Sequence, residues 1–159
     1  MSDNRMLNEQ YAEWGSELIA SEDALIDVRN SHATIVYLSS DYAKTDKGRT
    51  VYGQCERVAD KYKWGIPADF TITIFDPNVE GKSDEALRRI IFHELLHVGI
   101  DIDKDGDEKY SVRPHDFEDF KILIDRWGTN YAEVGDAPEW NADIEDLKFE
   151  DLERQARNG

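Results

Sequence analysis

The spacing of apolar residues along the chain predicts both helices and strands. Four stretches place apolar side chains three and four residues apart, which is the period of an amphipathic helix. These stretches are residues 4–27, 47–62, 84–99 and 115–127. Ser83 precedes the third stretch, which opens with Asp84 and Glu85, so we expect a helix with a capped first turn and favourable negative charge there.

Strand signals occupy the segments between these helices. Residues 33–38 and 69–75 are rich in β-branched and aromatic residues, as strands are. Asp105-Gly106 lies between residues 99–103 and 109–113, and this arrangement predicts a β-hairpin with a tight turn. The mixture predicts an α+β fold, in which a small mixed sheet packs on helices.

The C-terminal residues 129–159 differ in composition from the rest. They contain nine Asp and Glu against three Lys and Arg. Ile144 and Leu147 have the spacing of a short helix, whereas Pro138 and the charge density oppose compact packing. We therefore expect a single domain over residues 1–128, followed by an acidic tail that is partly helical or loosely packed.

The expected helix over residues 84–99 contains the sequence His93-Glu94-Leu95-Leu96-His97. Residues i and i+4 lie one turn apart on the same face of a helix, so both imidazoles can bind one metal ion. Glu94 lies beside them and can accept a proton from a metal-bound water molecule. A surface helix can carry this pattern by chance, but the surrounding apolar residues and a further histidine downstream favour a metal site.

A third ligand is needed, because a catalytic zinc ion typically binds three protein side chains and one water molecule. The chain has four histidines, and His115 stands at the start of the expected helix over residues 115–127. We expect His115 to complete the site with His93 and His97, since imidazole is the commonest ligand in such sites. The alternatives that remain open are the carboxylates of Glu118, Asp101 and Asp103.

Other side chains near these motifs could assist catalysis. A phenol or a guanidinium often stabilises the oxyanion that forms at a scissile carbonyl. Candidate groups for this role, or for binding the substrate, are Tyr110, Arg113 and Tyr131. Asp116 and Asp119 could accept the second N–H of a ligating imidazole. The strand over residues 69–75 could bind an extended peptide if it lies at a sheet edge.

Several of these segments together resemble the putative phage metallopeptidase family. They are Asp69-Phe70-Thr71-Ile72, His93-Glu94-Leu95-Leu96-His97, Arg113-Pro114-His115-Asp116-Phe117-Glu118-Asp119-Phe120 and Arg126-Trp127-Gly128. The resemblance covers about residues 32–128, and its motifs are specific in combination rather than singly. A more distant similarity is to the Spartan-like proteases.

This resemblance implies a zincin-like domain and a zinc-dependent peptidase of phage or prophage origin. It assigns His93, His97 and His115 to the zinc ion and Glu94 to general-base catalysis. The substrate that it implies is a protein or a peptide.

Composition restricts the cellular setting. Cys55 is the only cysteine, so an intramolecular disulfide is excluded, and its place in the helical pattern predicts a buried, unreactive thiol. No apolar stretch reaches membrane-spanning length, and residues 1–5 do not open a secretory signal peptide. We therefore expect a cytoplasmic protein without a membrane partner, located in the host bacterium if it comes from a phage.

The formal net charge is −16, from 19 Lys and Arg against 35 Asp and Glu. This balance argues against a nucleic-acid partner, because binding to phosphates needs clustered basic side chains. It also supports an alternative function, that of a non-catalytic, zinc-stabilised acidic protein that blocks a host bacterial factor. Glu94 favours the enzyme, since a structural zinc site requires no general base.

The charge balance leads to a testable expectation about DNA. Duplex DNA should not bind measurably at physiological salt, because the acidic protein and the phosphates repel each other. A fluorescence-anisotropy titration with a labelled duplex measures this directly. A micromolar or tighter Kd that weakens steeply with added salt would contradict the expectation and would support a Spartan-like role at DNA.

Overall fold

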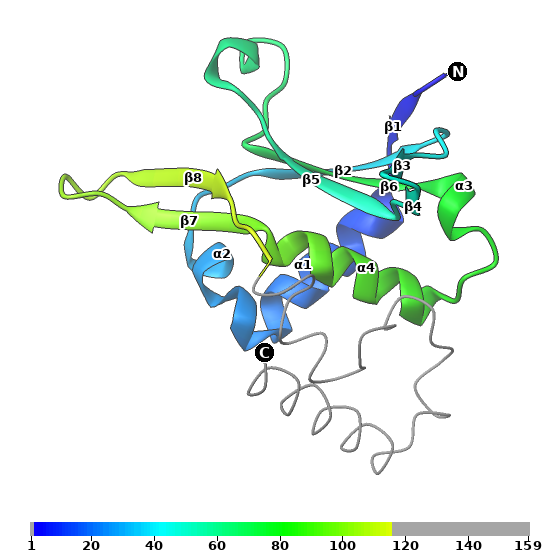
Figure 1. Ribbon diagram of the computed structural model, residues 1–159. Helices are drawn as coiled ribbons and strands as arrows, with labels where there is room; N and C mark the ends of the chain where they lie inside the picture. Colours follow the sequence, from blue (N-terminus) through cyan, green and yellow to red (C-terminus); the bar gives the residue numbers. More distant parts are fainter. Residues whose placement is uncertain (1, 116–159) are drawn as a thin grey trace, which may run out of the picture.

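The computed structural model describes residues 2–115 and shows helices layered on a small sheet (Figure 1). Its strands are β1 (Arg5–Leu7), β2 (Ile35–Ser40), β3 (Thr45–Asp46), β4 (Arg49–Thr50), β5 (Gly53–Arg57), β6 (Phe70–Phe75), β7 (Val98–Ile102) and β8 (Glu108–Val112). Its helices are α1 (Glu9–Ser21), α2 (Ile26–Asn30), α3 (Asp76–Val79) and α4 (Asp84–Leu96), with 3-10 turns at Asp23–Leu25 and Asp60–Tyr62. The expected α+β class is confirmed.

Four strands form the central sheet in the order β1-β2-β6-β5. Strands β2 and β6 are parallel, whereas β1 and β5 pair antiparallel at the two outer positions. Helices α1 and α4 lie side by side against one face of this sheet (Figure 1). The apolar core between the two layers includes Tyr11, Trp14, Tyr37, Ile72, Ile74, Ile91 and Leu95.

The strand expected over residues 69–75 is confirmed as β6, at an interior position of the sheet. Strand β2 pairs with one of its edges and β5 with the other. Both edges of β6 are therefore already hydrogen-bonded, and the idea that this strand offers an edge to a peptide is wrong. The outer strand beside it is β5.

The first expected helix begins later than its sequence pattern indicates. Residues 5–7 form β1 instead, and α1 begins at Glu9. Asn8 caps this helix, because its side-chain Oδ1 accepts a hydrogen bond of 2.9 Å from the backbone N–H of Tyr11. An N-cap residue has extended backbone geometry, so the chain can leave a strand and enter a helix within two residues.

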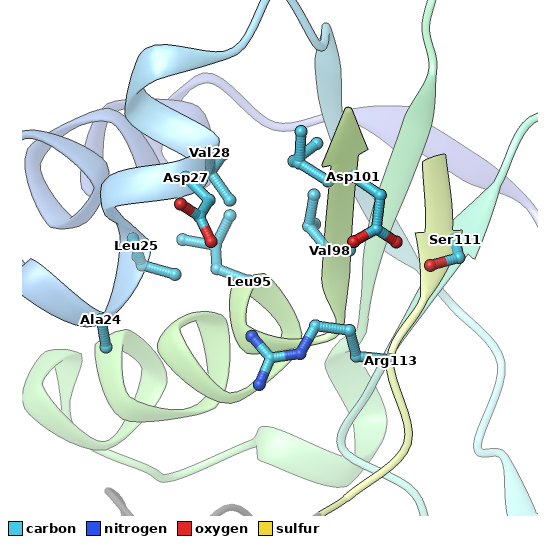
Figure 2. Close-up of a pocket in the computed structure, with 11 residues that line it drawn as sticks. Ala24, Leu25, Asp27, Val28, Leu95, Val98, Asp101, Ser111 and Arg113 are labelled. Carbon is cyan, nitrogen blue, oxygen red and sulfur yellow. The ribbon is translucent and has the colours of Figure 1, made fainter. Parts of the chain in front are cut away.

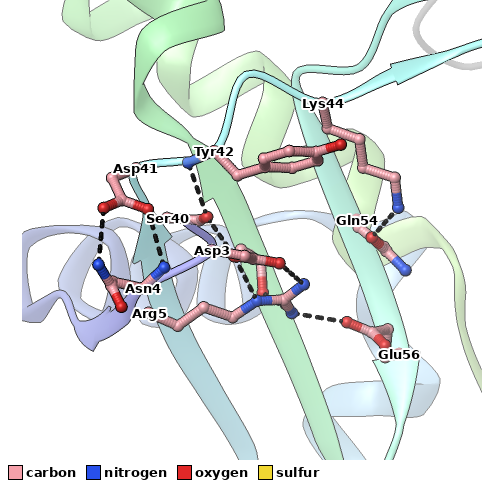
Figure 3. Close-up of polar contacts among 10 residues, drawn as sticks. Asp3, Asn4, Arg5, Ser40, Asp41, Tyr42, Lys44, Gln54 and Glu56 are labelled. Carbon is pink, nitrogen blue, oxygen red and sulfur yellow. Dashed lines mark hydrogen bonds and ion pairs between the residues drawn. The ribbon is translucent and has the colours of Figure 1, made fainter. Parts of the chain in front are cut away.

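A polar network on the face of the sheet opposite the helices ties the N-terminal segment to the neighbouring strands (Figure 3). The guanidinium of Arg5 donates to Glu56 at 2.8 Å and to Thr73 at 3.1 Å. Asp3 accepts a hydrogen bond from the hydroxyl of Ser40. Thr73 and Ser40 are buried although they face away from the apolar core, because this network covers them.

The helix expected over residues 47–62 is wrong. The chain there forms the hairpin β3–β4, the strand β5 and a 3-10 turn. Lys47 and Gly48 have φ angles of 51° and 78°, which close a tight hairpin turn that a helix cannot accommodate.

Cys55 is buried, as expected, but it reaches the core from strand β5 rather than from a helix. Its neighbours Gln54 and Glu56 point to the opposite face, where Lys44 and Arg5 bind them (Figure 3). This alternation of apolar and polar side chains is the two-residue period of a strand. Burial raises the pKa of the Cys55 thiol well above its ordinary value, which keeps it protonated and unreactive.

Helix α4 and the following hairpin agree closely with the sequence pattern. The hydroxyl of Ser83 accepts a hydrogen bond from the N–H of Ala86 and caps the helix at its expected start. The helix ends at Leu96, three residues before the expected end, because Val98 already begins β7. Strands β7 and β8 pair antiparallel across a turn in which Gly106 has a φ of 84°, so the expected hairpin is confirmed.

None of the described helices is long and apolar enough to cross a membrane. The expected helix over residues 115–127 lies outside the described residues, apart from His115, and so does the acidic tail.

The contact between α1 and the sheet provides a stability test. Gly15 of α1 lies directly over the ring of Tyr37, and a methyl group there would overlap that ring. Overfilling a packed core costs about 1–3 kcal/mol, whereas alanine gains ~1 kcal/mol over glycine in a helix. Gly15→Ala should therefore lower the free energy of unfolding by up to ~2 kcal/mol, measured by urea denaturation.

Gly65→Ala is the matched control, because a Cβ at this turn residue meets no atom within 4 Å. It should leave the unfolding free energy nearly unchanged. A Gly15→Ala protein as stable as the control would show that α1 does not pack on Tyr37 as described.

Candidate metal centre

His93 and His97 lie together at the C-terminal end of α4. His93 is in the last turn of the helix, and His97 is the residue that caps it. The four-residue spacing places their rings on one face, with centroids 5.2 Å apart. The motif thus presents two imidazoles at a helix end, where the chain reverses into β7.

The β7–β8 hairpin carries His115 back to these two residues. The antiparallel register pairs Val98 with Val112, and it extends one step further, since the N–H of Arg113 donates to the carbonyl of His97 at 2.6 Å. His115 follows two residues later. Its ring centroid is 4.9 Å from that of His93 and 4.5 Å from that of His97.

The nitrogens of these three side chains converge closely enough to share one ion. Within residues 2–115, His93, His97 and His115 are the one group of potential metal ligands whose atoms all lie within 4.8 Å of one another. The Nε2 atoms of His93 and His115 are 3.0 Å apart. Two nitrogens on one tetrahedral zinc ion lie about 3.3–3.4 Å apart, so little adjustment is needed.

The chemistry of this donor set fits zinc better than calcium or magnesium. Three imidazole nitrogens suit zinc, whereas the hard alkaline-earth ions require carboxylate and carbonyl oxygens. The ring orientation of His97 fits as well. Its Nδ1 lies 2.6 Å from the carbonyl oxygen of Arg113. A carbonyl only accepts, so Nδ1 carries the proton and Nε2 is the nitrogen with a lone pair for a metal ion.

Glu94 is buried beside this cluster, with a relative exposure of 5%. One carboxylate oxygen lies 3.8 Å from Nε2 of His93, so the side chain reaches the region where the imidazoles meet. Glutamate is rarely this buried without a specific partner, because removing a carboxylate from water is unfavourable. The position suits a base that acts on a water molecule at the metal site.

The side chain of Arg113 lines a cavity of about 400 Å³ (Figure 2). The cavity lies between α2, the end of α4 and the hairpin, with Leu25 and Leu95 among its apolar walls. Asp27 and Asp101 line it as well. Arg113 therefore contributes to the candidate site in two ways, since its backbone holds His97 and its side chain lines a neighbouring cavity.

Tyr110 occupies a structural position in the hairpin. Its hydroxyl donates to Glu108 at 2.6 Å, and its ring packs edge-on against Phe70. Burial and this hydrogen bond raise the pKa of Tyr110 to about 12, so the phenol stays protonated. The phenol would have to break its hydrogen bond with Glu108 before it could donate to an oxyanion.

The two hairpin carboxylates that could have replaced His115 lie elsewhere. Asp103 accepts hydrogen bonds of 2.9 Å from the N–H groups of Asp105 and Asp107 and so closes the turn. These bonds, above all the one from Asp107, hold the pKa of Asp103 below its usual value. Asp101 lines the cavity next to Arg113. The remaining candidates, which are Asp116, Glu118, Asp119 and Tyr131, lie outside the described residues.

Two contributions to the site were missed by reasoning from the sequence. The partner for the imidazole N–H of His97 is a backbone carbonyl, not one of the expected aspartates. Only the exact register of the hairpin could have indicated it. Gly53 of β5, which lies against Glu94, was also missed, because the chain there was expected to be helical.

Comparison with known proteins gives one match. A family model described as putative phage metallopeptidase matches residues 4–148 of the 159-residue chain. No curated protein and no solved structure matches significantly. The matched region contains the whole central sheet, α4, the hairpin and all three clustered histidines.

The convergence of three imidazoles predicts the effect of removing one. His115→Ala should lower the affinity for zinc by more than ~100-fold, since loss of an outer-shell partner alone costs about 10–100-fold. Competition titration with a chromophoric chelator measures this affinity. His32→Ala is the matched control, because His32 is exposed and does not belong to the group of three converging histidines. Equal zinc affinity in the two variants would exclude His115 as a ligand.

Proposed function

This chain belongs to the putative phage metallopeptidase family, and from that membership we propose that it is a zinc-dependent peptidase. His93, His97 and His115 hold the zinc ion in this proposal, and Glu94 is the general base. The observation that carries it is the convergence of three imidazoles within 4.8 Å beside a buried glutamate. A zincin-like fold for the domain is part of the same proposal.

The residues of this chain account for the proton transfers of peptide-bond hydrolysis. A bound zinc ion supplies a water molecule of lowered pKa and polarises the scissile carbonyl. Glu94 accepts a proton as the water oxygen adds to the carbonyl carbon, and it then delivers that proton to the departing amine. The carbonyl of Arg113, 2.6 Å from Nδ1 of His97, keeps that ring in the required tautomer throughout.

The proposed substrate is a protein or a peptide, as the family description supports. Strand β5 is the outer strand next to Glu94, and within residues 2–115 its second edge has no strand partner. An extended peptide could pair there by strand addition, with its scissile bond near Glu94. The position of Arg113 in the cavity supports the substrate-binding role rather than the oxyanion role for this residue.

We further propose that the protein acts in the cytoplasm of an infected bacterium, with host bacterial proteins as candidate substrates; the family description, which names phages, supports only the phage origin. The alternative, a zinc-stabilised acidic protein that blocks a host factor, has its support in the net charge of −16. The buried carboxylate of Glu94 favours the enzyme, because a purely structural site gains nothing from it.

Replacement of Glu94 separates metal binding from catalysis. Glu94→Gln should retain zinc and lose peptidase activity by about 10²–10⁴-fold, since the amide keeps the shape but cannot accept the proton. Cleavage of casein by the zinc-loaded protein is a suitable assay, with zinc content measured in parallel.

Glu80→Gln is the matched control, because Glu80 is an exposed residue just ahead of α4. It should cleave casein at the wild-type rate. Equal rates for Glu94→Gln and the wild type would remove Glu94 from the mechanism. Absence of cleavage by the wild type, across a panel of unfolded proteins, would favour the interaction protein.

A further inference from the structure

Strand β5 packs against the side chain of Glu94. Side chains alternate along this strand, and Gln54 and Glu56 belong to the polar network on the open face of the sheet (Figure 3). Residues 53 and 55 therefore face the helix layer, where Cys55 is part of the core. Strand β5 contacts α4, the helix that carries Glu94.

Gly53 is the residue of β5 that meets Glu94 directly. A Cβ atom at this position would lie 3.1 Å from Cγ and 3.3 Å from Oε2 of Glu94. On its other side, the same atom would lie 3.1 Å from Cδ1 of Ile74. The space for a side chain is therefore occupied from two sides, and one of the two occupants is the proposed general base.

A glycine inside a strand needs a reason, because it weakens the strand and often marks a close approach by another group. The φ angle of Gly53 is not positive, so its backbone does not require glycine. Cys55, two residues further on the same face, is buried in the core. Burial is the main reason that its thiol pKa is raised, and the negative charge of nearby Glu94 contributes as well. The close approach of Glu94 on one side and of Ile74 on the other explains the glycine.

We propose that Gly53 is a positioning residue, whose missing side chain lets the carboxylate of Glu94 sit at the distance from the metal site that proton transfer requires. This inference rests on the proposed peptidase function. Ile74 is fully enclosed in the core, with 1% exposure, so it cannot yield easily to an added methyl group. The flexible Glu94 side chain yields instead, and its carboxylate moves by a few tenths of an ångström.

The kinetic test compares Gly53→Ala with wild type in the zinc-loaded protein. A misplacement of 1 Å costs on the order of 100-fold in rate, so the smaller shift should lower kcat about 10-fold. KM and zinc content should not change, since the ligands and the substrate edge of β5 remain. Gly65→Ala adds the same methyl group where it meets no atom within 4 Å, and it should keep the wild-type kcat.

A rescue variant distinguishes positioning from general damage. Ile74→Val removes Cδ1, the second atom that a Cβ at residue 53 would meet. The double variant Gly53→Ala/Ile74→Val should recover part of the lost kcat, because the methyl group can then move away from Glu94. A purely structural defect would become worse, since the second substitution removes a buried methyl group.

A second readout does not depend on activity. Thermal unfolding of the four proteins in a double-mutant cycle of Gly53→Ala and Glu94→Ala measures whether the two residues touch. Gly53→Ala should lower Tm by about 3 °C with Glu94 present and by ~1 °C or less in the Glu94→Ala background. The contact of Cβ with Ile74 is common to both backgrounds and cancels.

The outcomes separate the inference from the function on which it rests. A wild-type protein that cleaves no protein substrate would overturn the proposed function and, with it, the role of Gly53. An active wild type with an unchanged kcat in Gly53→Ala would overturn the positioning role alone. Equal Tm changes in the two backgrounds would overturn the contact itself.

Discussion

Two hydrogen bonds between His97 and Arg113 connect the parts of the candidate site. The backbone N–H of Arg113 donates to the carbonyl of His97, and Nδ1 of His97 lies 2.6 Å from the carbonyl of Arg113. The first bond satisfies a carbonyl that a helix end leaves without a partner. The second fixes the imidazole. Because both hydrogen bonds involve Arg113, the residue that follows β8, they also help to fix the position of His115.

The layers of the fold hold the rest of the site in place. The sheet covers α4 from one side, and Ile91 and Leu95 anchor the helix in the core with no measurable exposure. Glu94, which lies in the same turn of this helix, is therefore buried and packs against Gly53 of β5. The same packing makes the site sensitive to small changes, because a close-packed interior has no free volume to absorb them.

Local signals in the sequence predicted the helix, the hairpin and the three histidines that the structure brings together. The cap at Ser83 and the turn at Gly106 are decided by neighbouring residues, so they can be read from a single chain. The failure over residues 47–62 has the opposite cause. Cys55 and its neighbours have a spacing that a helix or a strand could satisfy, and pairing with β6 decides between them. Gly53 and the carbonyl of Arg113 depend on contacts between distant segments, which no local pattern reveals.

X-ray absorption at the zinc edge of the purified protein examines the metal centre itself. Scattering from three imidazole rings and one further light atom, with zinc–ligand distances of about 2.0–2.1 Å, is the result that these contacts predict. A fit that requires fewer than three imidazoles, or a sulfur atom at about 2.3 Å, would contradict a site built from His93, His97 and His115.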